Sequence, residues 1–241
     1  MKLKIKRFCK HREPNAMVKE YEVPLEECTL LEALYFIKEQ IDPTLTFHSG
    51  CRSEVCGSCA VRVNEKEQLA CAYKVQEGDS IEALAKLPVL KDLVVDHEVS
   101  LNTLKKVKSW LDHESKPEIL SIEDEKKIEK QTDCILCASC YSSCPVLEVD
   151  QAFLGPFALT RAYRYTSDVR CEDEKSRIDA VQEKGIWDCT LCGECTAACP
   201  QGIDPKTDIM MLRSKSGQYG YMDPNFGASD DMFGGGFDPG F

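Results

Sequence analysis

Two stretches of this sequence concentrate cysteines at spacings that can bind a metal or a metal cluster. They are CILCASCYSSCP, residues 134–145, and CTLCGECTAACP, residues 189–200, and six of their twelve positions are identical. Each reads C-x2-C-x2-C-x3-C-P, so three thiols lie within seven residues and a fourth follows four residues later. Thiolates are ligands that suit zinc and iron–sulfur clusters. The repeat therefore predicts two metal sites with eight thiol ligands.

The spacing favours a pair of cubane iron–sulfur clusters that exchange their fourth ligands. In the bacterial two-cluster run, the first three cysteines bind one cluster and the fourth binds the other. By this rule site A takes Cys134, Cys137, Cys140 and Cys199, and site B takes Cys189, Cys192, Cys195 and Cys144. A double zinc ribbon is the alternative, but it does not need the overlapping C-x2-C-x2-C.

A third group of cysteines lies in the N-terminal half of the chain. Cys51, Cys56 and Cys59 share one loop and Cys71 follows, with the spacing C-x4-C-x2-C-x11-C. This is the plant-type [2Fe–2S] pattern, and the glycine and serine between the last two loop cysteines leave backbone N–H groups able to point at sulfur. A hairpin between Cys59 and Cys71 can return the fourth thiol to the loop. Zinc is the alternative, although it usually pairs two C-x2-C units and this loop has one.

The length, charge and composition of the chain exclude several classes of function. The chain has 241 residues, 15 cysteines and a formal net charge of −11, without a basic run of the kind that binds nucleic acid. The N-terminus lacks the apolar segment of a secretory signal, and no stretch approaches the roughly 18 apolar residues that span a bilayer. We therefore expect a reducing, cytoplasmic location, where clustered cysteines are more often metal ligands than disulfides.

The remaining candidates for chemistry are few. Cys9, Cys28 and Cys171 each stand alone, which fits buried small side chains or inert surface thiols. The histidines at 11, 48, 97 and 113 form no ligand spacing. We expect no catalytic residue in this chain.

The elements expected around the first cysteine group are mostly strands. KLKIKRF, residues 2–8, alternates charged residues with Leu3 and Ile5, as a half-buried strand does, and MVKEYEV, residues 17–23, is a second candidate. Thr29 and Glu32 form a capping box that predicts a helix to about residue 40. CAVRV and QLAC flank a polar NEKE and predict a hairpin. These are the parts of a β-grasp ferredoxin-like domain.

From about residue 97 the pattern becomes helical. Residues 99–111 place apolar side chains along one broad side; these are Val99, Leu101, Leu104, Val107 and Leu111. A second helix is expected from Ser121, three residues before Asp124, and two more over residues 155–165 and 175–184. The last 25 residues hold glycines and aromatics without a period, which fits a disordered tail or an arm that orders on a partner.

Together these patterns predict an α+β chain in three parts. Residues 1–100 form a β-grasp plant-type [2Fe–2S] ferredoxin domain, residues 101–213 an all-helical, bacterial-type domain with two cubane-type clusters, and residues 214–241 a tail rich in glycine and aromatics. We place the boundary between the two domains near residues 96–105.

With both halves in view, the chain resembles the iron–sulfur subunit of succinate dehydrogenase and fumarate reductase. The resemblance covers about residues 1–212. It rests on PTLTFHSGCRSEVCGSCAV, LACAYKV, LPVLKDLVVD, CILCASCYSSCP, FLGPFALTRAYRY and CTAACPQGIDP, which occur in the family's order. LPVLKDLVVD is the telling segment, because no cluster chemistry requires it and a standalone ferredoxin would lack it.

The resemblance implies an electron-transfer subunit of an oxidoreductase complex. Electrons from succinate oxidation at an FAD-containing flavoprotein subunit would enter at the [2Fe–2S] site, pass through site A to site B, and leave to a quinone-linked, membrane-associated partner. Fumarate reduction uses the same route in reverse. The chain would sit peripherally on the inner face of the cell membrane through partner subunits. The alternatives are an iron–sulfur wire of another flavoprotein or heterodisulfide reductase-type enzyme, a soluble ferredoxin shuttle, and a zinc scaffold.

The chain departs from common members of the family in three features. Cys192 stands where they lack a cysteine and hold a three-iron cluster at site B, so the expected cofactors are one [2Fe–2S] and two [4Fe–4S] clusters, the second [3Fe–4S] if Cys192 is a spectator. Val146, Leu147 and Glu148 stand where tryptophan lines a quinone pocket, and Thr190 where histidine is frequent. Both features resemble the E-type, methylmenaquinol:fumarate reductase-like branch, in which a separate Cys-rich subunit with CCG motifs follows the wire.

The third departure is Glu54, where the family usually has glycine. A bulky side chain there restricts the backbone. Its negative charge beside the cluster should also disfavour an added electron, so we expect a lower [2Fe–2S] potential than in relatives with glycine.

Overall fold

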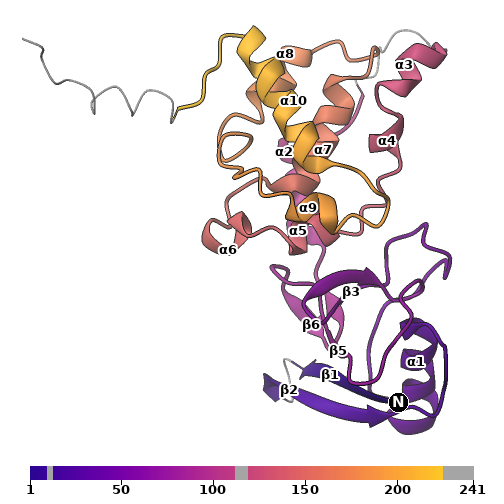
Figure 1. Cartoon of the computed structure of the whole chain (residues 1–241). Helices are drawn as coiled ribbons and strands as arrows, with labels where there is room; N and C mark the ends of the chain where they lie inside the picture. The colour runs from indigo at the N-terminus through magenta and orange to yellow at the C-terminus, as the bar shows by residue number, and fades with distance from the viewer. Residues whose placement is uncertain (10–12, 112–118, 225–241) are drawn as a thin grey trace, which may run out of the picture.

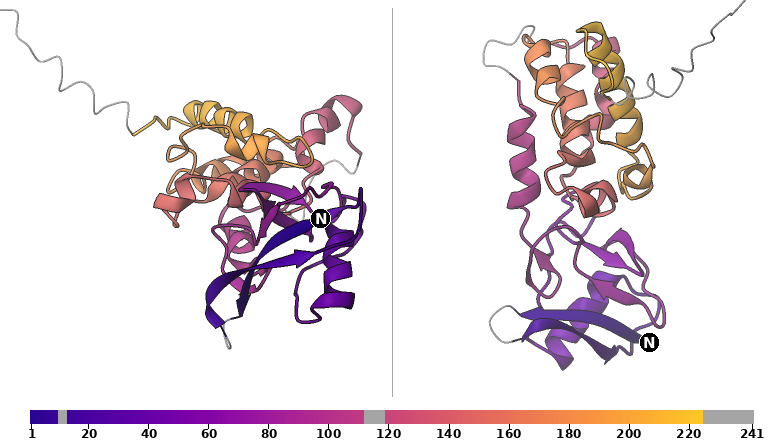
Figure 2. Two further views of the ribbon diagram at one scale, coloured as in Figure 1. Left: turned by 60° about the horizontal axis from the view of Figure 1, so that its bottom comes forward. Right: turned by 90° about the vertical axis from the view of Figure 1, so that its left-hand side faces the viewer.

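The computed structural model describes residues 1–9, 13–111 and 119–224. A sheet region comes first and a helical region follows it, and the two are stacked end to end (Figures 1 and 2). Within the described residues, seven strands form one sheet in the order β4-β3-β5-β1-β6-β7, with β2 paired to β1. The strands are β1 (Lys2–Cys9), β2 (Glu13–Glu22), β3 (Ala60–Val63), β4 (Lys66–Leu69), β5 (Ser80–Glu82), β6 (Val89–Lys91) and β7 (Val94–Val95).

The alternation along β1 builds the centre of this sheet. Leu3 and Ile5 are fully buried and Lys2, Lys4 and Lys6 face solvent, as the sequence predicts. Ile5 pairs with Lys19 of the antiparallel β2 and with Ile81 of the parallel β5. The same alternation places Arg7 on the buried face, where it is 8% exposed.

The predicted capping box is present and begins α1 (Leu30–Phe36). The Thr29 hydroxyl accepts the N–H of Glu32, while the Glu32 carboxylate accepts the N–H of Thr29. The helix continues as a π-helical turn, η1 (Ile37–Ile41), so the predicted end near residue 40 is confirmed. The N–H groups of Leu30 and Leu31 donate to the carbonyls of Tyr73 and Ala70, which joins α1 to the segment that carries Cys71.

The predicted hairpin is formed by β3 and β4. Its two turn residues, Asn64 and Glu65, both have left-handed backbone, with φ of 49° and 67°. This is the conformation that two-residue hairpins favour. The Asn64 side chain secures the turn, because it donates to Asp79 Oδ1 at 2.7 Å and accepts the N–H of Ser80 at 2.9 Å.

The helical region is built around α7 (Gly155–Thr166), which packs against α10 (Pro205–Gln218) and α2 (Glu98–Lys106) (Figure 1). Shorter helices complete it: α3 (Ile122–Lys126), α4 (Glu129–Thr132), α5 (Ser139–Ser142), α6 (Val146–Val149), α8 (Glu174–Asp179) and α9 (Glu194–Ala197). In the part of the chain described, no helix combines the length and the apolar character needed to cross a bilayer.

The apolar side predicted for residues 99–111 is present only in part: Val107 is fully buried and Leu104 packs against the core, but the first turn of the helix differs. Val99 and Leu101 are each 41% exposed, whereas Ser100 and Thr103 are buried at 0% and 7%. Two small hydroxyl residues can enter the core here because each satisfies its own oxygen. Ser100 Oγ donates to the His97 carbonyl at 3.0 Å, and Thr103 Oγ1 to the Ser100 carbonyl at 2.6 Å.

The predicted start of the tail also differs from the structure. Helix α10 continues to Gln218, five residues beyond the boundary placed at residue 213. Tyr221, after the helix, donates its hydroxyl to Asp179 Oδ1 at 2.6 Å. Residues 225–241, which make up most of the predicted tail, lie outside the described residues.

Candidate metal centres

The loop over residues 50–57 wraps its backbone around the first cysteine of the N-terminal group. Arg52, Glu54 and Gly57 have φ of 61°, 64° and 70°, and these left-handed residues turn the chain sharply. As a result the N–H groups of Ser53 and Val55 both donate to Cys51 Sγ at 3.4 Å. The loop therefore offers hydrogen bonds to sulfur before any metal is considered.

The thiols of this group differ in their surroundings. Cys51 is exposed, and the backbone N–H groups directed at its sulfur lower its pKa to about 6. Cys59 is buried, and its burial raises its pKa to about 11. An exposed thiolate at one side and a buried thiol at the other fit a group that is held partly inside the protein and partly at its surface.

The β3–β4 hairpin returns the fourth thiol to the loop, as predicted. Ala60 pairs with Leu69, and the N–H of Ala70 donates to the Cys59 carbonyl at 3.0 Å. Cys71 consequently lies beside Cys59, and their side chains interact. The N–H of Cys51 reaches Cys56 Sγ at 3.4 Å, so the four predicted ligands are gathered in one place.

The two cysteine repeats adopt the same backbone conformation. The third position of each, Leu136 and Leu191, has φ of 55°, and the fifth, Ala138 and Gly193, has φ of 62° and 88°. A single helical turn follows in both copies, as α5 and α9. Each repeat therefore forms the same loop, with its first three cysteines on the inside of the turn.

Each loop receives one cysteine from the other repeat. One hollow is lined by Cys134, Cys137, Cys140 and Cys199, and a second by Cys144, Cys189, Cys192 and Cys195. The placement agrees with the exchange of fourth ligands that the spacing predicts, while the ligation itself stays a prediction.

The donor chemistry of both hollows fits iron–sulfur clusters. The walls of the first are otherwise mostly apolar, with Ile135, Phe157 and Ile203 among them. Backbone N–H groups point at sulfur in both: that of Ile203 at Cys199 Sγ and that of Leu191 at Cys189 Sγ, each at 3.4 Å. Hydrogen bonds to sulfur and burial are what tune such clusters. Among the described residues, no three His, Cys, Asp or Glu side chains come together closely enough to hold a single ion.

Burial dominates the acidity of the inner thiols. It raises the pKa of Cys140 well above its ordinary value, that of Cys195 to about 12, and that of Cys144 as well. Thiols with raised pKa values become thiolates only when a metal replaces the proton. Assembly of both sites is therefore expected to release protons.

Helix α10 brings charged side chains to the second hollow and close to Cys134 of the first, and these were not predicted. Lys206 lines the second hollow, and Arg213 Nη2 donates to the carbonyl of Cys189 at 2.7 Å. Asp208 is buried near Cys134 of the first hollow and accepts a hydrogen bond from Gln131 Nε2 at 2.7 Å. Its burial raises its pKa to about 6. No spacing in this segment signals these roles.

The structure also explains LPVLKDLVVD, the segment that no cluster chemistry requires. Its Asp92 is 3% exposed and accepts from Arg7 Nε at 2.9 Å, and from the N–H groups of Phe8 and Thr46 at 3.1 and 2.9 Å. One carboxylate thus ties strand β1 to the chain that leads into the loop of Cys51.

Among the described residues, the other cysteines and histidines form no further group of metal ligands. Cys28 is buried beside α1, and Cys9 and Cys171 are half-buried. His48 is exposed and His97 is half-buried, while residues 11 and 113 lie outside the described residues.

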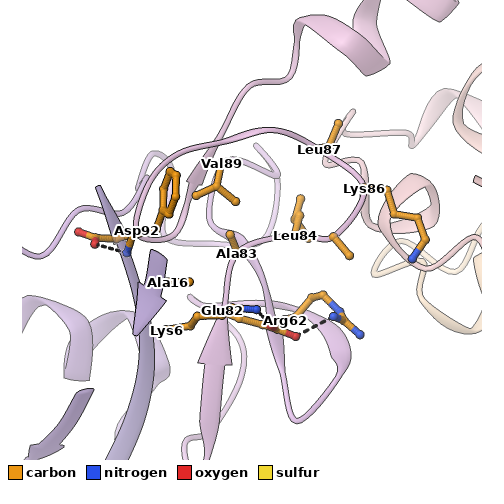
Figure 3. Close-up of a pocket in the computed structure, with 12 residues that line it drawn as sticks. Lys6, Ala16, Arg62, Glu82, Ala83, Leu84, Lys86, Leu87, Val89 and Asp92 are labelled. Carbon is orange, nitrogen blue, oxygen red and sulfur yellow. Dashed lines mark hydrogen bonds and ion pairs between the residues drawn. The ribbon is translucent and has the colours of Figure 1, made fainter. Parts of the chain in front are cut away.

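A surface hollow of about 420 Å³ lies over the sheet, apart from the cysteines (Figure 3). Its charged side chains pair with carboxylates: Arg62 with Glu82 at 2.6 Å, Lys6 with Glu82 at 3.1 Å, and Lys86 with Glu148 at 2.8 Å. We assign no ligand to it.

A sheet region with one group of four cysteines, followed by a helical region with two, defines an iron–sulfur protein. Residues 2–102 match the family described as a 2Fe-2S iron-sulfur cluster binding domain, and residues 130–203 match the 4Fe-4S dicluster domain.

Comparison with curated proteins identifies the family. The chain is 34% identical to the fumarate reductase iron-sulfur subunit of Escherichia coli, over 81% of this chain and 84% of that protein. It is 35% identical to the fumarate reductase iron-sulfur subunit of Mycobacterium tuberculosis, over 88% and 90%. It is 38% identical to the 8-methylmenaquinol:fumarate reductase iron-sulfur subunit of Wolinella succinogenes, over 78% of this chain and 64% of that protein.

A solved structure supports the fold. A chain of the Mycobacterium smegmatis Sdh1 complex in the apo form superposes with a TM-score of 0.82 at 20% identity, covering 92% of this chain and 98% of that one. This protein belongs to the iron–sulfur subunits of succinate dehydrogenase and fumarate reductase, so the expected family is confirmed.

Proposed function

We propose that the chain conducts electrons between an FAD-containing flavoprotein subunit and a quinone-linked, membrane-associated partner, through three sites. The ligands are those predicted from the spacing: the four cysteines of the N-terminal group, the four of site A and the four of site B. Clusters bound there supply one-electron transfer. The observation that carries the proposal is that the four thiols of each set are gathered in one place, in three sets along one chain.

The loop of Cys51 is the side at which a flavoprotein can approach. Cys51 and Cys56 are exposed, and Val55 between them is 67% exposed. The N–H groups of Ser53 and Val55 donate to Cys51 Sγ and compensate its negative charge.

Site B is the side at which electrons leave toward the membrane partner. Cys192 is exposed, in contrast to the buried Cys144 and Cys195 of the same set. Site A and site B adjoin through α5 and α9, which pack against each other. The order of the sites from one exposed loop to the other supports a directional path through the protein.

The finer assignments follow from the same residues. The sheet region corresponds to a β-grasp ferredoxin domain and the helical region to a bacterial-type two-cluster ferredoxin domain, with the boundary near residues 96–105. Cys192 lines the second hollow with its three partners, which favours two [4Fe–4S] clusters beside one [2Fe–2S] cluster. On this ligand set we propose that the chain belongs to the E-type branch, with a CCG-motif subunit as the partner and peripheral attachment to the inner face of the membrane.

Co-purification tests the proposal. A tag on this chain, expressed in its own host and isolated anaerobically, is expected to bring down a flavoprotein with covalent FAD and succinate- or fumarate-linked activity. Peptide mass spectrometry then identifies the membrane partner. Recovery of a different flavoprotein would contradict the proposal, and so would a stable monomer that reduces soluble acceptors alone.

A further inference from the structure

The loop of the N-terminal site touches the loops of site A at two points. At the first, Gln201 donates from Nε2 to the carbonyl oxygen of Glu54 at 2.9 Å, although the two residues are 147 positions apart. Gln201 follows directly after Cys199 and Pro200, and Glu54 lies between Cys51 and Cys56. One hydrogen bond therefore joins the predicted ligand loop of one site to that of the next.

At the second point, Gly57 lies against the backbone of the first repeat. A Cβ atom added to Gly57 would lie 2.7 Å from Cys137 Cβ, 2.9 Å from the Ile135 carbonyl oxygen and 3.0 Å from Cys137 Cα. These distances are too short for real carbon contacts, and the atoms they involve are mostly backbone. The two loops can approach this closely only because residue 57 has no side chain.

A separate set of contacts holds the two regions together elsewhere. The N–H of Ala85 donates to Ser142 Oγ at 2.8 Å, and Ser142 Oγ donates to Glu67 Oε1 at 2.8 Å. Lys86 pairs with Glu148 at 2.8 Å. Changing Gln201 or Gly57 is therefore expected to alter the gap between the two loops and to leave the regions joined.

We infer that Gly57 and Gln201 are positioning residues that fix the separation of the N-terminal site and site A, and with it the rate at which an electron passes between them. The inference rests on the proposed function. In this step one electron passes from the N-terminal site to site A, and the flavoprotein is the reductant that supplies it. No covalent bond forms or breaks, and no proton is transferred. Electron tunnelling falls exponentially with distance, so a contact that holds two ligand loops at van der Waals distance controls this step directly.

The first test replaces Gly57 by alanine and uses Gly78→Ala as the matched control. Gly78 has a left-handed φ of 83°, close to the 70° of Gly57, but no atom lies within 4 Å of an added Cβ. Both variants meet the same backbone strain, and only Gly57→Ala pushes the loops apart. The second test, Gln201→Leu, removes the hydrogen bond at similar size, with the exposed Gln151→Leu as its control.

The readouts are applied to the anaerobically purified complex. Iron content and the EPR spectrum of the reduced N-terminal site show that each variant is assembled. The enhancement of its spin relaxation by reduced site A reports their separation, and rapid-mixing reduction gives the transfer rate. We expect weaker relaxation enhancement in Gly57→Ala and Gln201→Leu, and transfer slowed severalfold, because the tunnelling rate falls exponentially with the added distance. Both controls are expected to match the unmodified protein.

Unchanged relaxation and rate in the assembled Gln201→Leu variant would overturn the inference. So would an equal loss in Gly57→Ala and Gly78→Ala. If Gly57→Ala fails to assemble its N-terminal site, Gln201→Leu decides, because residue 201 lies outside that site. The relaxation measurement needs only this chain and its clusters, so the inference can hold even if co-purification identifies another partner.

Discussion

The buried ion cluster around Arg7 allows a sharp test of what holds the N-terminal loop in place. Arg7 donates from Nε to Asp92 Oδ1 at 2.9 Å and from Nη1 to Asp42 Oδ2 at 2.8 Å. Asp92 in turn accepts the N–H of Thr46, five residues before Cys51. We therefore predict that Arg7→Met, which keeps an unbranched apolar stem but removes the guanidinium and its charge, destabilises the sheet and the loop that it supports.

The size of the destabilisation depends on the buried carboxylates that lose their cation. Removing one partner of a buried pair costs about 3–5 kcal/mol. Asp42 keeps a cation, because Lys19 Nζ lies 2.7 Å from its Oδ2, whereas Asp92 keeps only backbone donors. We expect the lower part of that range, about 3 kcal/mol. At about 2–4 °C per kcal/mol for a chain of this size, this lowers the melting temperature by roughly 10 °C.

The assay is urea denaturation followed by circular dichroism and by the visible absorption of the N-terminal cluster, under anaerobic conditions. Lys6→Met is the control, because Lys6 lies on the same strand, is 52% exposed and pairs with Glu82 at the surface. Such pairs contribute about 0–1 kcal/mol. If both variants lost the same free energy of unfolding, the predicted role of the buried cluster would be wrong. A loss below about 1 kcal/mol in Arg7→Met would contradict it as well.

The pH dependence gives the prediction a second signature. Burial opposes the charge of Asp42, but hydrogen bonds from Lys19, Thr44, Tyr21 and Arg7 outweigh it and lower its pKa well below the ordinary range. A lowered pKa stabilises the folded state above the unfolded value, 3.8, and this stabilisation is lost as the pH falls through the folded value. The gap between the unmodified protein and Arg7→Met should therefore be full near pH 7 and shrink below about pH 4.

Three further predictions concern the sites. Glu54→Gly relieves a left-handed φ of 64° and removes a negative charge, so the midpoint potential of the N-terminal site should rise in an EPR-monitored titration; an unchanged potential would contradict this. Lys206→Met removes a cation beside the second hollow and should lower the potential of site B, and a rise would exclude the role. Burial raises the pKa of Asp208 from 3.8 to about 6, so the folded protein loses stability as the pH rises through that interval. The Asp208→Asn variant should therefore be more stable than the unmodified protein, by up to about 3 kcal/mol at pH 8 and by less at pH 5, in urea denaturation. A gap that widens at pH 5 would show that the carboxyl is stabilised as an anion.

Features set by neighbouring residues were predictable from the sequence. The capping box at Thr29, the hairpin turn at Asn64 and the loops of the two repeats depend on side chains and φ angles within a few positions of one another. The return of Cys71 to its loop was predictable for the same reason, since a short hairpin fixes where both of its ends lie. The spacing therefore predicted that the cysteines within each loop come together, whereas the exchange of Cys144 and Cys199 between the repeats was predicted from the two-cluster pattern.

Features set by distant contacts were not predictable. Arg7 looks like one more charged residue of β1, and only its partners 35 and 85 positions away show why it is buried. The buried face of α2 was missed because Ser100 and Thr103 satisfy their hydroxyls locally and pack on α7 as small residues. Gln201 gives no signal at all, because its partner is a backbone carbonyl 147 positions away in the sequence.

The central claim is that twelve cysteines hold three iron–sulfur clusters, with Cys192 completing site B. An iron count together with an EPR spectrum of the anaerobically purified, oxidised protein tests it most directly. The account predicts about ten iron atoms per chain and a silent spectrum, because oxidised two-iron and four-iron clusters are diamagnetic. A strong three-iron signal near the free-electron position would make Cys192 a spectator, and bound zinc without iron would contradict the claim as a whole.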